Sequence, residues 1–371
     1  MNAVQRRTAT PPTCWPPRSG SSRATRPPAT RKTPVPHLSA PQAYALFQRM
    51  RGRRVLVVGD LMVDEWIWGR VSRISPEAPV PVVEVTDHSF TLGGAANVAT
   101  NLRVLGADVR LAGVVGDDRV AERLRGMVSE LGVNDDGLFV AHDRPTTRKT
   151  RIVAHNQQVV RADWERATAV PEATAAKLSA HVRAAARDVD AVIFSDYAKG
   201  LLTRTLVEAA LSACSVVTAD PKPANLDLFT GVTCIAPNAG EAAKAAGVTI
   251  GDDATLEQAG RALLERLGCM HALITRGEHG MSLFSPGKPR FDVPAVARTV
   301  FDVSGAGDTV ISVLTLALAA GTPVLDAVTL ANFAAGAVVE KLGTAAASPE
   351  EIVELLQHYD GADGSADTAQ L

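Results

Sequence analysis

The 371-residue chain lacks several patterns that identify common classes of protein. Its four cysteines lie far apart and form no CxxC pair, which argues against a zinc site or a disulfide framework and favours reduced thiols. Its eight histidines show no HExxH motif, so a zinc enzyme is also disfavoured. No apolar run reaches the roughly 18 residues that a membrane span needs. We therefore expect a cytoplasmic protein that does not contact a membrane.

Acidic residues are absent from the first 59 positions, which contain eleven lysines and arginines. The rest of the chain therefore carries 27 basic against 40 acidic residues, although the formal net charge of the whole is only −2. An acidic body is a poor surface for nucleic acid, so no nucleic-acid partner is expected. Residues 1–38 are rich in arginine and proline and predict a disordered tail. A second flexible tail is expected over residues 361–371.

Between residues 39 and 360, short apolar runs alternate with helical stretches. The runs RRVLVVGD, DVRLAGVVGDD, DAVIFSD, SVVTADPK, VTCIAPN and HALITRG predict strands, and the amphipathic stretches between them predict helices. This alternation predicts one α/β domain, a doubly wound and mostly parallel sheet with helices on both faces. Ligands of such sheets bind at the carboxyl ends of the strands.

Polar residues follow five of these strands, as expected if one site collects them. They are Asp60, Ser195 and Asp196, Asp220 and Lys222, Asn238 and Glu241, and Thr275 to Gly277.

Two segments, at about 64–91 and 137–166, break the alternation because they are extended and rich in β-branched residues. They are too long for ordinary connections, which typically have about 4–6 residues. We expect them to form a small β-sheet lid that excludes water from the site. Trp66 and Trp68 are two residues apart and should share one face of this lid. A homodimer through the lid is the expected assembly.

The stretch FDVSGAGDTV (301–310) runs into the apolar sequence of a helix predicted over Asp308–Ala320. The amides of Gly305, Ala306 and Gly307 would face an anion there, because a helix N-terminus offers unpaired N–H donors. Asp308 then places a carboxylate beside that anion, as the general base of phosphoryl transfer requires. The alternative is an ordinary glycine-rich turn with an acidic first helical turn. The combination with GGAAN (93–97) and NAGE (238–241) favours the catalytic interpretation.

At these residues the chain resembles the ribokinase-like, or PfkB, carbohydrate kinase family over residues 52–345. The two family signatures are matched by GGAANVATNLRVLGADVRLAGVVGDD and DVSGAGDTV. The resemblance implies that Asp308 is the catalytic base, that Gly305, Ala306 and Gly307 form the anion hole, and that ATP and Mg²⁺ are used. Asn238 and Glu241 match the NxxE motif, with Glu241 serving the metal through water. The implied nucleotide-binding residues are completed by Thr275, Gly277, Gly280, Asn332 and Gly336.

Three strings, VVGDLMVDEWIWGRVSRISPEAPVPVVEV, SDYAKGLL and DPK, are similar to one branch of this family. That branch phosphorylates D-glycero-β-D-manno-heptose 7-phosphate at C1 for ADP-heptose and lipopolysaccharide core synthesis. Because no HxGH motif of a fused nucleotidyltransferase follows, a kinase-only form is expected. The candidate substrate-binding residues are Asp64, Gly93, Gly94, Asn97, Arg148, Lys149, Arg151, Asp196 and Lys222.

Alternatives from other classes remain at this stage. Another PfkB sugar or sugar-phosphate kinase would share all these motifs. A dinucleotide-dependent oxidoreductase predicts GxGxxG after the first strand, whereas the chain reads VVGDLMVD. A binding or regulatory protein on the same fold is disfavoured because it has no use for a base such as Asp308.

Overall fold

The computed structural model describes residues 38–155, 157–297, 300–341 and 343–364, and the side chains of all of these up to residue 359. The predicted N-terminal tail, except for Leu38, and most of the predicted C-terminal tail lie outside this part of the chain. Cys214, Cys234 and Cys269 are free thiols, and Cys14 lies outside the described residues. Within the described residues, none of the helices combines the length and the apolar composition that a membrane span requires.

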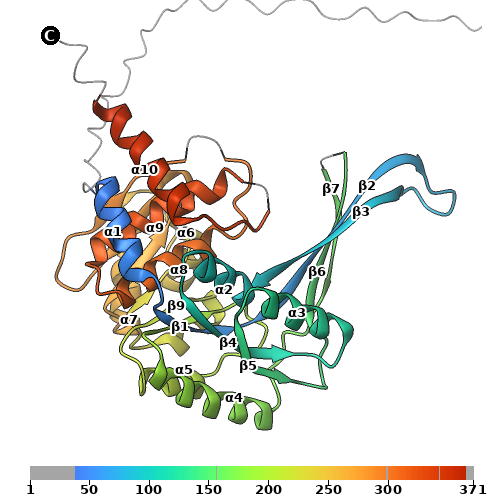
Figure 1. Cartoon of the computed structure of the whole chain (residues 1–371), viewed down its shortest axis with the longest axis horizontal. Helices are drawn as coiled ribbons and strands as arrows, with labels where there is room; N and C mark the ends of the chain where they lie inside the picture. Colours follow the sequence, from blue (N-terminus) through green and yellow to red (C-terminus); the bar gives the residue numbers. More distant parts are fainter. Residues whose placement is uncertain (1–37, 156, 298–299, 342, 365–371) are drawn as a thin grey trace, which may run out of the picture. The chain divides into compact units, whose positions relative to one another are not determined.

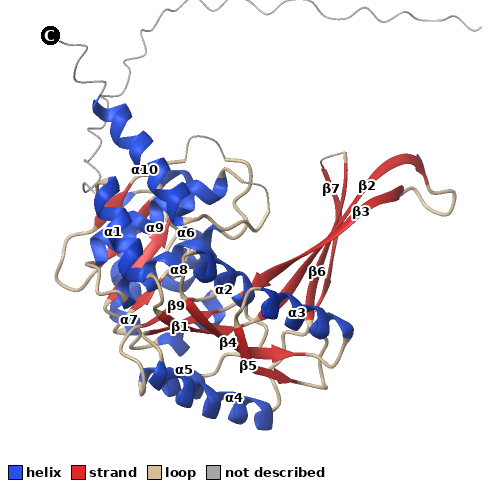
Figure 2. Ribbon diagram, in the orientation of Figure 1, coloured by secondary structure: helices blue, strands red, loops and turns tan. Residues whose placement is uncertain are grey.

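A nine-stranded sheet forms the centre of the fold, in the order β13-β12-β11-β10-β9-β8-β1-β4-β5. Figure 1 labels β1, β4, β5 and β9 of this sheet, and Figure 2 shows helices around its strands. All neighbouring pairs from β11 to β5 are parallel, and β12 and β13 add an antiparallel edge. The chain runs from β1 to β4 and β5, then returns to pair β8 with the other side of β1. The strands are β1 Arg54–Gly59, β4 Asp108–Val115, β5 Asn134–Val140, β8 Ala191–Ser195, β9 Val217–Asp220, β10 Cys234–Ile235, β11 His271–Thr275, β12 Met281–Phe284 and β13 Phe291–Val293.

Helices cover both faces of this sheet, because alternate residues of each strand point to opposite sides. Val55 and Val57 of β1 pack into one apolar core, and Leu56 and Val58 pack into another. The first core contains α1 Ala40–Met50, α2 Ala95–Val104, α3 Arg119–Glu130, α8 Ala306–Ala319, α9 Val324–Val339 and α10 Pro349–Gly364. The second contains α4 Glu172–Ala185, α5 Arg204–Leu211, α6 Ala239–Ala246 and α7 Asp253–Leu267. Three short 3₁₀ helices lie at Ala186–Asp188, Pro223–Phe229 and Gly277–His279.

A second, four-stranded sheet has the order β3-β2-β6-β7, and we call it the accessory sheet (Figure 1). Its strands are β2 Leu61–Ile74, β3 Pro81–Gly94, β6 Thr147–Ala154 and β7 Gln157–Trp164. Only Asp60 separates β2 from β1, and β3 leads directly into α2. The first five residues of β2 are buried, and its last three are exposed. One end of the accessory sheet is therefore packed on the body, and the other end is surrounded by solvent.

Two local differences from the sequence expectation have physical reasons. Residues 137–140, expected in the second insertion, belong to β5, an edge strand of the main sheet. Helix α8 begins at Ala306 and not at Asp308, because Gly305 adopts a φ of +80° and caps the helix two residues earlier. Trp66 and Trp68 share one face as expected, and their rings stack with centroids 5.6 Å apart.

Candidate active site

The reversal of strand order beside β1 places the carboxyl ends of β1 and β8 next to each other. Ligands of doubly wound sheets bind at such a reversal. Asp60 follows β1, and its Oδ2 accepts hydrogen bonds from the amides of Tyr197 and Lys199 in the loop after β8, at 2.8 and 3.1 Å. Burial raises the pKa of Asp60 to about 6, against the effect of these two bonds. Asp60 therefore fixes the loop that carries Tyr197.

Asp308, the third residue of α8, lies at the centre of the candidate site and is 4% exposed. Its Oδ2 accepts a hydrogen bond from Asn97 Nδ2 at 2.7 Å, and its Oδ1 accepts one from Tyr197 Oη at 2.8 Å. Burial raises the pKa of Asp308 to about 6, whereas these two bonds and the charge of Lys222 act to lower it. Above that pH the carboxylate is ionised and held in one orientation, so it can accept a proton.

The first turn of α8 offers main-chain donors next to Asp308. Its amides have no partner within the helix, as at every helix N-terminus. The amide of Ala306 donates to the carbonyl of Val303 at 3.3 Å, so this donor is engaged in the turn. Gly307 has an ordinary φ, and a Cβ there would meet only Asp220 Oδ2, at 3.7 Å. Neither backbone strain nor packing within the chain requires glycine at position 307. A glycine there is instead consistent with a ligand that closely approaches the main chain.

Gly305 and Asn238 have roles in the fold as well as in the candidate site. The φ of Gly305 favours glycine, and a Cβ there would lie 2.9 Å from Asn97 Nδ2. Asn238 Oδ1 accepts from the amide of Glu241 at 2.9 Å, and Glu241 Oε2 accepts from the amide of Asn238 at 3.0 Å. This reciprocal capping box starts α6 at the end of β10. Thr275 pairs with Asn238 through an isolated backbone bridge, so the end of β11 runs beside the start of α6.

An acidic pair surrounds the lysine that follows β9. Lys222 Nζ donates to Glu241 Oε1 at 2.5 Å. Burial raises the pKa of Asp220 to about 8; the charge of Lys222 opposes this shift, and the charge of Asp308 adds to it. Because Asp220 also faces Gly307, these groups border the first turn of α8. Lys222 therefore places a positive charge close to Asp220 and Asp308 at the candidate anion site that α8 forms.

The remaining candidate nucleotide residues shape loops. Gly277 and Gly280 have φ values of +56° and +78°, and a Cβ on Gly280 would lie 2.0 Å from the carbonyl oxygen of Val293. The side chain of Asn332 on α9 donates to the carbonyl of Pro294 at 2.8 Å. Gly336, one turn later, lets Val296 pack against α9. Asn332 and Gly336 thus hold the segment after β13 against α9.

At the base of the accessory sheet, Asp64 is 4% exposed and bonded to Arg151 Nη1 at 2.5 Å. A Cβ on Gly93 would lie 2.4 Å from Asp64 Oδ2, so the small residue makes room for this carboxylate. Gly94 has a φ of +58° and starts α2, which carries Asn97 to Asp308. The structure therefore brings the four candidate sugar residues of this region together beside Asp308.

The three basic residues predicted on the lid do not lie on the same face of the accessory sheet. Lys149 and Arg151 of β6 pair in register with Asp64 and Trp66, whereas Arg148 alternates to the opposite side. There Arg148 lies 3.6 Å from Glu65 Oε2 and stacks 4.0 Å from the ring centroid of Trp164. Arg148 is therefore separated from the candidate sugar residues, contrary to the sequence expectation.

Asp196 also differs from its expected surroundings. It is fully buried, and its carboxylate accepts hydrogen bonds from the amides of Ala198 and Lys222 and from the side chain of Asn225. These contacts tie the loops after β8 and β9 together. Its carboxylate is committed to the fold, so we remove it from the residues expected to contact a ligand directly.

Sequence reasoning missed Tyr197 and underused Asp60 and Asp220. All three lie at or just after strand ends, which was the available signal, but only the folded chain shows that Tyr197 reaches Asp308 from 111 residues away.

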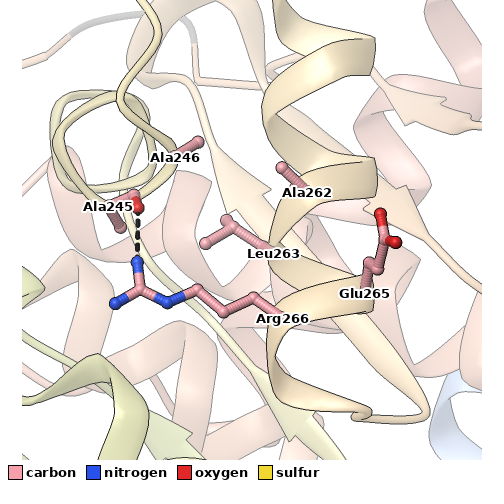
Figure 3. A pocket seen from close by; sticks show the side chains of 6 residues that line it. All are labelled: Ala245, Ala246, Ala262, Leu263, Glu265 and Arg266. Atoms are coloured by element: carbon pink, nitrogen blue, oxygen red, sulfur yellow. Dashed lines mark hydrogen bonds between the residues drawn. The ribbon is translucent and has the colours of Figure 1, made fainter.

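A cavity of about 300 Å³ lies away from this site, between the end of α6 and α7 (Figure 3). It is lined by Ala245, Ala246, Ala262, Leu263, Glu265 and Arg266, and the guanidinium of Arg266 donates to the carbonyl of Ala245. It shares no residue with the candidate active site.

Comparison with known proteins gives a consistent assignment. The model of the pfkB family carbohydrate kinases matches residues 53–351. The chain is 51% identical over 311 residues to the protein named Bifunctional protein HldE of Desulfatibacillum aliphaticivorans, a match that covers 82% of this chain and 63% of that protein. A protein of the same name from Caulobacter sp. (strain K31) is 46% identical over 322 residues, which cover 85% of this chain and 65% of that protein. The chain thus spans less than two thirds of the length of these relatives.

Solved structures confirm the predicted fold class. Arabidopsis thaliana ribokinase, complexed with ribose and ATP, matches with a TM-score of 0.66 at 18% identity, covering 82% of this chain and 99% of that one. Escherichia coli phosphofructokinase-2, in complex with substrates and products, matches with a TM-score of 0.67 at 15% identity, covering 82% and 99%. The fold is ribokinase-like. The chain belongs to the PfkB family of carbohydrate kinases, and its class is that of an ATP-dependent sugar kinase.

Proposed function

We propose that the chain transfers the γ-phosphoryl group of ATP to the C1 hydroxyl of D-glycero-β-D-manno-heptose 7-phosphate. The product would be the 1,7-bisphosphate, for ADP-heptose and lipopolysaccharide core synthesis in the cytoplasm. The observation that carries the proposed chemistry is the position of Asp308, which lies in the first turn of α8 and is held by Asn97 and Tyr197. The choice of heptose is supported by the sequence similarity of the β2–β3 segment to the heptose branch.

In the proposed mechanism, Asp308 accepts the proton of the C1 hydroxyl as its oxygen bonds to the γ-phosphorus. The bond from that phosphorus to the oxygen bridging it to the β-phosphate breaks, and ADP leaves. The amides of Gly305 and Gly307, and that of Ala306 once it leaves the carbonyl of Val303, stabilise the charge on the transferred group. An anomeric hydroxyl is more acidic than an ordinary alcohol, so a carboxylate with a pKa of about 6 is a sufficient base.

Magnesium fits this site as an ion that binds through water and phosphate oxygens. Both oxygens of Glu241 are engaged, one by the amide of Asn238 and the other by Lys222. The described residues include no cluster of three or more His, Cys, Asp or Glu side chains that could hold a metal alone. Mg²⁺ usually keeps several waters and uses one or two carboxylates together with substrate phosphates. When bound with ATP, it would neutralise phosphate charge, and Glu241 would orient its water.

A homodimer through the accessory sheet is also proposed. The accessory sheet and the turn between β2 and β3 carry large apolar side chains that are exposed in the single chain: Trp68, Ile74, Val80, Val85, Val159, Val160 and Trp164. Exposed apolar surface of this kind marks interaction sites. The molar mass in solution, measured by light scattering, tests this assembly.

The proposed substrate is tested by ADP release with a panel of acceptors. We expect heptose 7-phosphate to give the highest kcat/KM, above ribose, fructose 6-phosphate and adenosine. The control is the rate of ATP hydrolysis without a sugar. This rate should be low, because Asp308 is buried and little exposed to water. A higher kcat/KM with another sugar would replace the heptose assignment but leave the kinase class unchanged.

Tyr197→Phe tests the contact that orients the base. The hydrogen bond from Tyr197 lowers the pKa of Asp308, so its loss should move the acidic limb of kcat/KM upward from about pH 6. The shift should be about one unit, with roughly tenfold lower turnover, because a hydrogen bond to a charged group contributes about 1.5 kcal/mol. Phenylalanine keeps the aromatic ring, whose centroid lies 5.4 Å from Lys222 Nζ in the unsubstituted chain. An unchanged acidic limb would show that Tyr197 does not affect the pKa of the catalytic base.

A further inference from the structure

Two lysines from separate segments meet on one carboxylate next to the candidate sugar site. Glu165 follows β7, and its Oε1 accepts a hydrogen bond from Lys199 Nζ at 2.7 Å. Its Oε2 lies 3.6 Å from Lys149 Nζ, which is also 3.4 Å from Asp163 Oδ2. The side chains of both lysines are less than one fifth exposed. Glu165 therefore bridges two largely covered ammonium groups.

The position of this bridge relates it to Asp308. Lys149 pairs in register with Asp64, so the two side chains share the face of β6 and β2 that Arg148 does not reach. Lys199 lies two residues after Tyr197, whose hydroxyl donates to Asp308. The backbone amide of Lys199 is fixed by Asp60 at 3.1 Å. One lysine thus comes from the accessory sheet and the other from the loop that orients the base.

A phosphate monoester matches what these lysines hold. It offers several strong acceptor oxygens on one small anion, as the carboxylate offers two, but with a higher charge. Two covered ammonium groups without an anion would repel each other and lose solvation. The carboxylate of Glu165 already contacts both ammonium groups, so a phosphate that binds both lysines would take its place between them.

We propose that Lys149 and Lys199 hold the phosphate ester of a sugar monophosphate acceptor, in the position that the carboxylate of Glu165 occupies in the free chain. The inference rests on the proposed function, because it identifies the end of the acceptor opposite to the hydroxyl that reacts. Glu165 makes the site selective: an unphosphorylated sugar cannot displace it and leaves the two lysines paired.

Binding of inorganic phosphate, measured by calorimetry without nucleotide, tests the site directly. Glu165→Gln should tighten phosphate binding about three- to tenfold, because the competing charge is removed. Lys149→Met and Lys199→Met should each weaken it about tenfold or more. Lys177→Met, at an exposed lysine on α4, is the matched control and should leave it unchanged. Equal affinities in all five proteins, or weaker binding by Glu165→Gln, would overturn the proposal.

Steady-state kinetics separates this proposal from the assignment of the acceptor. With heptose 7-phosphate as substrate, the two lysine variants should raise its KM about tenfold and leave the KM for ATP within twofold. If the wild-type chain turns over heptose 7-phosphate but the lysine variants keep its KM, the phosphate site is wrong and the function stands. If phosphate binding depends on both lysines but heptose 7-phosphate is not turned over, the phosphate site stands and the heptose assignment fails.

Discussion

Asp308→Asn is expected to lower kcat about a hundredfold or more, because an amide cannot accept the proton of the sugar hydroxyl and a general base contributes about 10²–10⁴. The substitution keeps the size of the side chain, and its oxygen can still accept one of the two bonds that Asn97 and Tyr197 now donate. Binding of ATP and of the sugar should therefore change much less than turnover. Single-turnover kinetics and equilibrium binding of both substrates measure the two effects separately.

The matched control is Asp60→Asn. Burial also raises the pKa of Asp60 to about 6. Its carboxylate, however, accepts hydrogen bonds from two backbone amides and is not proposed to contact the substrate. An asparagine oxygen can accept both bonds. The acidic limb of the pH profile near pH 6 should persist in Asp60→Asn, whereas the residual activity of Asp308→Asn should lose it. Near-normal turnover of Asp308→Asn would show that Asp308 is not the general base.

The strands that line the site were predictable because each is a continuous apolar run followed by polar residues. VLVV of β1 and AVIF of β8 are buried on both faces, as parallel strands between two helical layers must be. The glycine-rich turn before α8 was also predictable, since Gly305 adopts a conformation that favours glycine, although the helix was expected to start two residues later than it does. These features depend on local sequence and on one rule of sheet topology, so they needed no knowledge of distant contacts.

The face of Arg148 could not be predicted, because TRKTR in β6 is polar on both sides and a shift of one residue exchanges the two faces. The assignment of residues 137–140 to β5 could not be predicted either, because the sequence NDDGLFV of this edge strand starts with polar residues. Neither pattern contains the alternation that fixes a register. The role of Asp196 was also hidden, because a carboxylate at a strand end has the same local sequence whether it contacts a ligand or a loop.

Contacts between distant segments were the other part that required the structure. Asn97 reaches Asp308 across 211 residues, and Tyr197 reaches it across 111. The two donors come from α2 and from the loop after β8, which the main sheet brings together. The sequence predicted Asp308 as the base but not its neighbours, so its raised pKa and fixed orientation could be derived only from the folded chain.

Asp220→Asn is expected to stabilise the protein at neutral and alkaline pH. Burial raises the pKa of Asp220 to about 8 in the folded chain, from an ordinary value of 3.8. Between these two pH values the folded protein keeps a proton that the unfolded chain has lost. The free energy of unfolding therefore falls as pH rises, by about 1.4 kcal/mol per unit as an upper limit. Asparagine does not titrate, so the variant avoids this loss.

The gain should be close to zero at pH 4, grow from pH 5 to 8 and level off above pH 8, where it should reach several kcal/mol. Denaturant unfolding at a series of pH values measures it. The pKa values of Asp60 and Asp308 are raised only to about 6, so the change between pH 6 and 8 is assigned mainly to Asp220. Asp188→Asn, at a carboxylate that is 69% exposed, is the control and should show no such trend. A gain independent of pH would mean that Asp220 is already ionised at low cost, and the proximity of Lys222 would then outweigh burial.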